Sequence, residues 1–305
     1  IVDDEFGVGA RFHILGFSSL DTDVTVAASI PDASIVINGA FFDGLGLPQS
    51  PEDAPSIEAF KATMVHEIGH FLNLDHNVLN HEAANDGNPA NDVFLPSMFP
   101  LVAEDEAALA SLNPDDQAAL LGLYPPAGPA PAGVFGKVSA GGVPFQGANV
   151  VIRKVGTPFD RLMTAYSGFS GALFFPCFDG SLCNVCADPA CPQAPAARGE
   201  YAIRFIDPGT YTLCVEQIDA RPDISVAVNE FSFGARAAIL PGPEECFNLG
   251  GEAAADTDDP DDATSLSIGT GVQAGPFDFV INDLVQTDSF ESNDDIGSAA
   301  EIDTI

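Results

Sequence analysis

The spacing of apolar residues changes near residue 56, where strand-like runs give way to a helical pattern. Short apolar runs separated by loop residues predict three strands, at residues 12–17, 24–28 and 34–42. From Ser56 onward the apolar residues recur at spacings of three and four, which predicts a helix with Ser56 as its N-cap. A second helix is predicted at residues 114–123, because Asn113 can cap it and proline suits its first position.

A third pattern begins after residue 133 and is strand-like throughout. Alternating runs bounded by glycine and proline predict five strands, at residues 134–138, 149–154, 201–205, 210–216 and 277–282. Runs of this kind are typical of a β-sandwich. The stretch PPAGPAPAG separates the two halves and cannot continue a helix, so residues 126–133 are predicted to be a stiff linker. The expected fold class is therefore α+β, with a mixed domain at 1–125 and an all-β domain at 134–284.

Composition narrows the possible partners. The 305 residues are more than one domain usually needs, and 45 acidic against 10 basic residues give a formal charge of −35. Such a surface repels phosphate backbones, which excludes nucleic acid as a partner. No apolar run approaches the ~18 residues of a membrane span. The six cysteines are even in number and all follow residue 176, which favours disulfides and a secreted protein.

The residues with the clearest chemistry lie in the first predicted helix and just after it. His66 and His70 are four positions apart, so they project from one face of a helix toward one point. Two imidazoles placed in this way can bind Zn²⁺, and Glu67 beside them can accept a proton from a water on the metal. His76 can supply a third nitrogen if the chain leaves the helix and turns back. Asn73 is the expected turning point, because asparagine tolerates the left-handed conformation.

Chance placement of histidines on a surface helix is the competing interpretation of this pattern. The chain has only five histidines, and three of them fall at ligand spacing within eleven residues. The sequence therefore predicts a metal site made by His66, His70 and His76.

Three motifs, in order, resemble the metzincin metallopeptidases of the matrixin-like branch. HEIGHFLNLDH at 66–76 resembles the zinc signature HExxHxxGxxH, with Asn73 in place of the usual glycine. SMFP at 97–100 resembles the Met-turn, in which a methionine, here Met98, forms a hydrophobic base under the three histidines. NPDDQAALLGLY at 113–124 is similar to the last matrixin helix, where paired aspartates precede an apolar run ending in Leu-Tyr.

The resemblance implies a secreted zinc endopeptidase that acts on proteins or peptides. One catalytic Zn²⁺ would be held by His66, His70 and His76, with Glu67 as the general base. It also implies a catalytic domain that lacks its first elements here, and it makes residues 34–42 either the substrate-binding edge strand or an ordinary strand. The alternative from another class is an extracellular binding or adhesion protein with a catalytically inactive metzincin domain.

Other polar groups receive structural interpretations. Residues 77–96 are polar and rich in asparagine, so they are predicted to be an inserted loop, with His81 as a loop residue. His13 lies in an apolar strand and is interpreted as a packed core histidine. Ca²⁺ is the second candidate metal. Carboxylates at Asp43, Glu52 and Asp53 could hold it, but a solvated loop is the favoured interpretation there and for the Asp-rich run at 256–262.

The second half carries two further resemblances. GKV at 136–138, PFQGANV at 144–150, GEYAI at 199–203 and PGTYTL at 208–213 resemble transthyretin-like, carboxypeptidase-regulatory sandwiches. A Cys-rich insert at 177–191 interrupts this pattern. Its four cysteines could bind zinc, but their short spacing favours two local disulfides, which leaves Cys214 and Cys246 as a pair. Residues 285–305, with DSFESNDD at 288–295, resemble the start of a bacterial pre-peptidase C-terminal domain.

Overall fold

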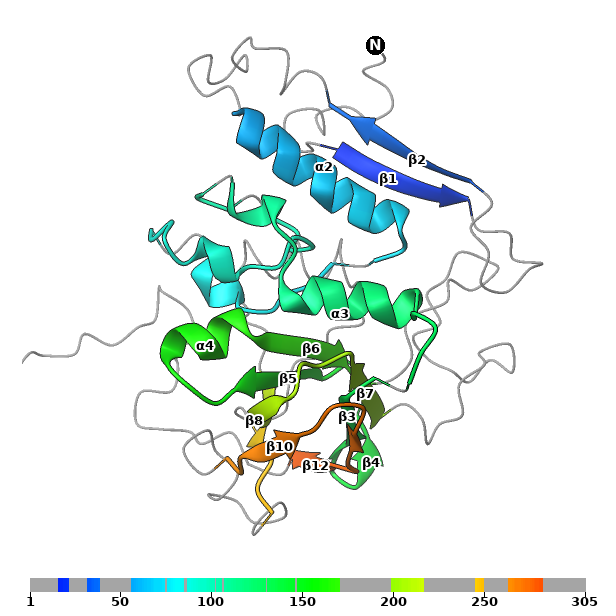
Figure 1. Cartoon of the computed structure of the whole chain (residues 1–305), viewed down its shortest axis with the longest axis vertical. Helices are drawn as coiled ribbons and strands as arrows, with labels where there is room; N and C mark the ends of the chain where they lie inside the picture. Colours follow the sequence, from blue (N-terminus) through cyan, green and yellow to red (C-terminus); the bar gives the residue numbers. More distant parts are fainter. Residues whose placement is uncertain are drawn as a thin grey trace, which may run out of the picture.

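The chain folds into a helical part with a small sheet and a larger β part, as its computed structural model shows (Figure 1). The residues described are 16–21, 32–38, 56–74, 76–84, 87–101, 103–105, 107–129, 131–145, 147–170, 199–216, 245–249 and 263–281. Helices and largely antiparallel sheets both occur, which confirms the α+β class in this coarse sense. Within those ranges, no helix is both long enough and apolar enough to cross a membrane.

A two-stranded antiparallel sheet lies beside the first long helix (Figure 1). Strand β1 (Gly16–Asp21) pairs with β2 (Asp32–Ile37) from Gly16 opposite Ile37 to Asp21 opposite Asp32. The described ends of two predicted strands, at 12–17 and 34–42, fall in β1 and β2. The predicted strand at 24–28 lies outside the described residues.

Helix α2 (Ile57–Phe71) begins where the sequence predicts. The Ser56 hydroxyl oxygen accepts a hydrogen bond from the Ala59 N–H at 3.1 Å, which satisfies one of the free donors of the first turn. Its buried face is made of small and polar residues: Ala59, Ala62, Thr63, Glu67 and Gly69. The larger Ile57, Ile68 and Phe71 are 66%, 43% and 40% exposed. The apolar period thus predicts the helix, while the buried face follows from what packs against it.

The connection from α2 to α3 (Pro114–Leu123) has no long helix and no strand in its described residues, in keeping with the inserted loop predicted at 77–96, and much of it is buried, although residues 87–90 are exposed. It contains the short 3₁₀ helices η2 (His81–Ala83) and η3 (Asp92–Phe94), and η4 (Ala108–Ala110) follows. His81, predicted to be a loop residue, begins η2 in this connection and is 3% exposed. Several of its apolar residues belong to a second core cluster. This cluster comprises Ala62, Val78, Ala83, Ala84, Leu95, Phe99, Ala103 and Leu109.

Helix α3 (Pro114–Leu123) has the predicted bounds, and Asn113 is its N-cap residue. The Asn113 N–H donates to the Asp116 carboxylate at 3.0 Å, so the carboxylate of the third helical residue satisfies the cap's backbone. The side-chain nitrogen of Asn113 makes two further hydrogen bonds. It donates to the carbonyls of Phe94 (3.0 Å) and Leu95 (2.7 Å), which fixes the start of α3 to the preceding segment.

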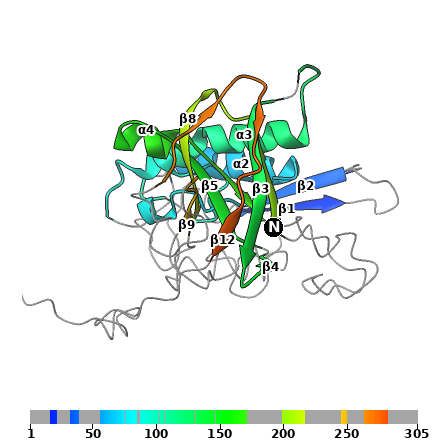
Figure 2. The same cartoon turned by 90° about the horizontal axis from the view of Figure 1, so that it is seen from below.

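The β part consists of two sheets that share one core. One sheet has the order β10–β8–β5–β6 with β9 on β8, and the other has β11–β3–β12 with β4 and β7 also on β3. Figure 2 shows β3 with β12 and β4 on one side and β5, β8 and β9 on the other. The elements are β3 (Gly133–Ala140), β4 (Val143–Pro144), β5 (Asn149–Lys154), α4 (Pro158–Met163), β6 (Ala165–Phe169), β7 (Glu200–Arg204), β8 (Gly209–Glu216), β9 (Glu245–Cys246), β10 (Leu266–Ile268), β11 (Gln273–Ala274) and β12 (Phe279–Ile281).

Each of the five strands predicted after residue 133 overlaps an observed one. The sequence pattern did not predict α4, β4, β6, β9, β10 or β11. A disulfide joins Cys214 on β8 to Cys246 on β9, as predicted. The Cys-rich insert at 177–191 and residues 285–305 lie outside the described residues. The likeness to transthyretin-like domains stays a prediction.

Candidate metal centre

The end of α2 turns the chain back toward its own histidines. Asn73 adopts the left-handed conformation with φ 67°, as the sequence predicts. The Asn73 N–H donates to the His70 carbonyl at 2.8 Å, and the Leu74 N–H donates to the Gly69 carbonyl at 2.9 Å. These bonds close the helix end, so the chain reverses and His76 faces the last turns of α2.

The three histidines meet at their Nε2 atoms. The Nε2 of His66 lies 3.1 Å from that of His70 and 3.1 Å from that of His76, and the third separation is 3.0 Å. Imidazole nitrogens bound 2.0–2.1 Å from a tetrahedral ion are about 3.3 Å apart. The observed triangle therefore matches three ligands of one metal ion to within a few tenths of an ångström.

The hydrogen bonds of two of these rings indicate which nitrogen carries the proton. The Nδ1 atoms of His66 and His70 lie 2.9 Å from the carbonyl oxygens of Ser97 and Leu74. A carbonyl oxygen only accepts hydrogen bonds, so each Nδ1 carries the proton and each Nε2 presents a lone pair. Lone pairs 3.1 Å apart repel one another, and a shared cation removes that repulsion. The donor set thus fits a metal ion.

Burial keeps the imidazoles of His66 and His76 neutral. Removal from water lowers the pKa of His66 to about 4, and the nearby His70 lowers it further, against a smaller effect of the Ser97 carbonyl. Burial also lowers the pKa of His76 to about 2, and both other histidines add to the effect. Neutral imidazole is the form that binds metals, so His66 and His76 need not lose a proton to bind one at pH 7.

Glu67 lies beside the histidine cluster and is 4% exposed. The Ser18 hydroxyl on β1 lies 3.0 Å from Glu67 Oε2 and 2.8 Å from the Glu67 carbonyl oxygen, either of which can accept its proton. Burial raises the pKa of the Glu67 carboxyl, while the Ser18 hydrogen bond and His70 lower it. Ser18 holds the carboxylate in place. Its sequence position, 49 residues before Glu67, carries no signal that could have identified it.

Met98 packs against α2 beside the histidine cluster, and its assignment as a Met-turn stays a prediction. It is 2% exposed, and a Cβ added at Gly69 would overlap its Sδ. Gly69 sits between the two histidines of α2, so the methionine packs directly against the helix at the site. The neighbouring Ser97 carbonyl accepts the hydrogen bond from His66, which links the same turn to a ligand.

The paired aspartates of α3, Asp115 and Asp116, accept hydrogen bonds from segments that lie next to the histidines. The Asp116 carboxylate accepts from the Ser97 N–H at 2.8 Å and from the Met98 N–H at 3.3 Å, so it orients the turn under the histidines. Asp115 is 3% exposed and accepts from Asn77, which directly follows His76 in sequence. Burial raises the pKa of both carboxyl groups, that of Asp115 to about 6. The sequence indicated this pair only through the family resemblance, without a role.

The remaining candidate residues do not join the cluster within the described part of the chain. There, the three histidines form the only group of three or more His, Cys, Asp or Glu side chains that could share an ion. The candidate calcium carboxylates at Asp43, Glu52 and Asp53, the Asp-rich run at 256–262 and His13 lie outside it, so the calcium prediction stays open.

Comparison with known proteins gives no match: no family model, no curated protein and no solved structure is similar to this chain. Its function is therefore inferred from the geometry of the site and from the motif.

Proposed function

We propose that this chain contains a zinc-dependent endopeptidase of the metzincin type, in its matrixin-like branch. The observation that carries the proposal is the convergence of the three Nε2 atoms of His66, His70 and His76, with the Glu67 carboxylate beside them. Met98 under α2 and the left-handed turn at Asn73 support the same assignment.

Zinc is the favoured ion because three imidazoles leave one position of a tetrahedron open, as in catalytic zinc sites. When bound, zinc supplies the Lewis acidity that makes water acidic near neutral pH and polarises a carbonyl group. His66, His70 and His76 would hold it. The carbonyls of Ser97 and Leu74 would keep two of the ligand rings in the binding tautomer.

Glu67 would move the protons of the reaction. Its carboxylate accepts a proton from the attacking water and passes it to the amide nitrogen that leaves when the peptide bond breaks. Burial raises the pKa of the Glu67 carboxyl toward neutral pH. A general base works best when its pKa lies near the pH of the reaction. The Ser18 hydroxyl keeps the carboxylate from rotating away.

Strand β2 offers a place for an extended substrate. Within the described residues it pairs with β1 alone, so its other edge is open there. An extended peptide could add to that edge through main-chain hydrogen bonds. The disulfide Cys214–Cys246 supports secretion, because such bonds persist in oxidising compartments.

A pair of variants tests the proposed reaction. Glu67→Gln keeps the side-chain volume and a partner for Ser18 but removes the base. It should lower casein hydrolysis by 10²–10⁴-fold or more and leave zinc bound. His70→Ala should lose both zinc and activity. If Glu67→Gln hydrolysed casein at the wild-type rate, the general-base role would be wrong, and an adhesion or binding role would gain support.

A further inference from the structure

The sheet β10–β8–β5–β6 has one face in the sandwich core and another turned toward the metal centre. Val150, Ile152 and Leu213 point into the shared core. The alternate residues Val151 and Ala165 point outward, yet they are only 1% and 2% exposed. They form a separate buried cluster with Leu79, three positions after His76. The outer face of the sandwich therefore covers the segment that follows the third ligand.

A buried carboxylate links the same two regions. Asp115 accepts hydrogen bonds from the Ser167 N–H at 2.7 Å and from the Ser167 hydroxyl at 3.0 Å, while Asn77 donates to it from the other side. The Asn77 N–H in turn donates to the Met98 carbonyl at 2.9 Å. The residue after His76 is thus tied both to the turn under the site and, through Asp115, to strand β6.

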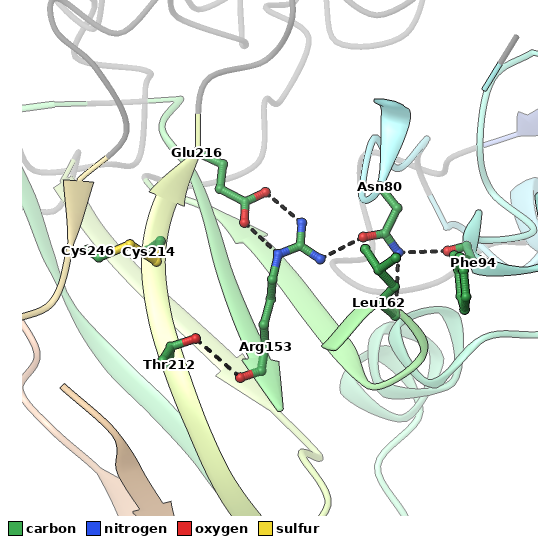
Figure 3. A network of polar contacts seen from close by, with 8 residues as sticks. All are labelled: Asn80, Phe94, Arg153, Leu162, Thr212, Cys214, Glu216 and Cys246. Atoms are coloured by element: carbon green, nitrogen blue, oxygen red, sulfur yellow. Dashed lines mark hydrogen bonds and ion pairs between the residues drawn. A yellow bond between two sulfur atoms is a disulfide. The ribbon is translucent and has the colours of Figure 1, made fainter. Parts of the chain in front are cut away.

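Arg153 makes a second link, drawn in Figure 3. Its guanidinium forms a bidentate ion pair with Glu216 at 2.7 and 2.8 Å and donates a third hydrogen bond to the Asn80 side-chain oxygen at 2.6 Å. Asn80 has φ 59° and donates to the carbonyls of Phe94 and Leu162 at 2.8 and 3.1 Å. The left-handed turn at Asn80 is therefore held by sandwich residues as well as by its own segment.

We propose that this outer face is part of the metal centre, with Ser167 and Arg153 as positioning residues that hold residues 77–80 and, through them, His76. His76 is the one ligand that lies outside α2, so the helix alone cannot fix its position. The proposal rests on the proposed metal site but does not depend on peptidase activity.

Two variants of the sandwich remove these links. Ser167→Ala deletes the hydroxyl bond to Asp115 and keeps the backbone bond. The double variant Arg153→Leu/Glu216→Leu removes the link to Asn80 without leaving Glu216 unpaired, since an apolar pair often replaces a buried ion pair without loss of stability. The matched controls are Ser139→Ala, which loses a 3.2 Å hydroxyl bond in the other sheet, and Glu216→Gln, which keeps Arg153.

The test measures the Zn²⁺ dissociation constant by competition with a chelator and the visible spectrum of the Co²⁺-loaded full chain. We expect the dissociation constant to rise about tenfold in Ser167→Ala and in the double variant, since changes around metal ligands cost 10–100-fold. The Co²⁺ spectrum should shift in both, and the controls should stay within twofold of wild type.

Wild-type affinity and an unchanged Co²⁺ spectrum in Ser167→Ala and in the folded double variant would overturn the proposal. If the double variant does not fold, the comparison of Ser167→Ala with Ser139→Ala decides. A wild-type chain that binds neither Zn²⁺ nor Co²⁺ would instead overturn the proposed metal site itself. An inactive wild-type chain with normal metal binding would refute the peptidase alone.

Discussion

The backbone conformation of Asn73 is what allows the third histidine, His76, to reach His66 and His70. A left-handed conformation costs most residues with a Cβ roughly 1–2 kcal/mol, and asparagine and glycine are the usual exceptions. The motif predicts this turn from local chemistry alone, and the observed φ of 67° confirms it. The side chain is exposed, so a substitution there acts through the backbone.

Asn73→Val should therefore weaken zinc binding and lower the free energy of unfolding by about 1–2 kcal/mol, because a β-branched residue resists the left-handed conformation. Asn73→Gly is the control, and it should keep the wild-type zinc affinity within about threefold, since glycine adopts this conformation freely. Urea unfolding and chelator competition measure both quantities. Equal affinities for the valine and glycine variants would show that the turn does not position His76.

The lowered pKa values of His66 and His76 predict how acid affects the metal-free protein. Below about pH 6.5 each of these histidines takes up a proton in the unfolded state but stays neutral in the native state. The free energy of unfolding therefore decreases as the pH falls. The loss is about 1.4 kcal/mol per pH unit for each such histidine until the native pKa is reached. Asp115 acts in the opposite direction, because its raised pKa lets the native state take up a proton between about pH 6 and 4.

Comparing wild type with His76→Gln separates the two effects, since Asp115 is common to both. In metal-free protein unfolded with urea at pH 7, 6 and 5, the variant should gain stability relative to wild type as pH falls. The expected gain is about 1 kcal/mol per unit. Parallel pH profiles for the two proteins would contradict the lowered pKa of His76.

Among the elements, helix α2 shows what a hydrophobic pattern can and cannot predict. Its start and N-cap follow from the sequence, but its buried face consists of small and polar residues, among them Gly69, against which Met98 packs closely. The periodicity of a helix shows only which of its own residues are apolar. The close contact at Gly69 depends on Met98, which lies 29 positions further along the chain. The same limit explains why the Ser18 contact to Glu67 was not predicted.

Gly69→Ala tests this packing. The added Cβ would overlap the Met98 Sδ, so the methionine must move, and such overpacking costs typically 1–3 kcal/mol. Gly122→Ala in α3 is the matched control, because a Cβ there meets nothing within 4 Å and should add up to about 1 kcal/mol of stability through helix propensity. Thermal unfolding compares them. A Gly69→Ala protein as stable as Gly122→Ala would contradict the close Met98 contact.

For the whole molecule, the sequence predicted two patterns joined by a linker, and the structure shows that the two parts also pack together. The prolines at 125–131 indicate where the chain stops being helical, but they carry no information about contacts between the parts. Asp115 and Ser167 are 52 positions apart, and Asn80 and Arg153 are 73 apart. The loop predicted at 77–96 carried no prediction of burial, and the structure places Val78, Ala83, Ala84 and Leu95 of this segment in a core cluster. The domain boundaries themselves stay a prediction.

The central claim is a metal centre made by His66, His70 and His76, and metal analysis of the folded chain tests it most directly. Wild-type protein purified without chelators, or reconstituted with Zn²⁺ and dialysed, should contain about one zinc per chain. His70→Ala, treated identically, should contain almost none. Wild-type protein without zinc after reconstitution, or with no more than His70→Ala retains, would contradict the account.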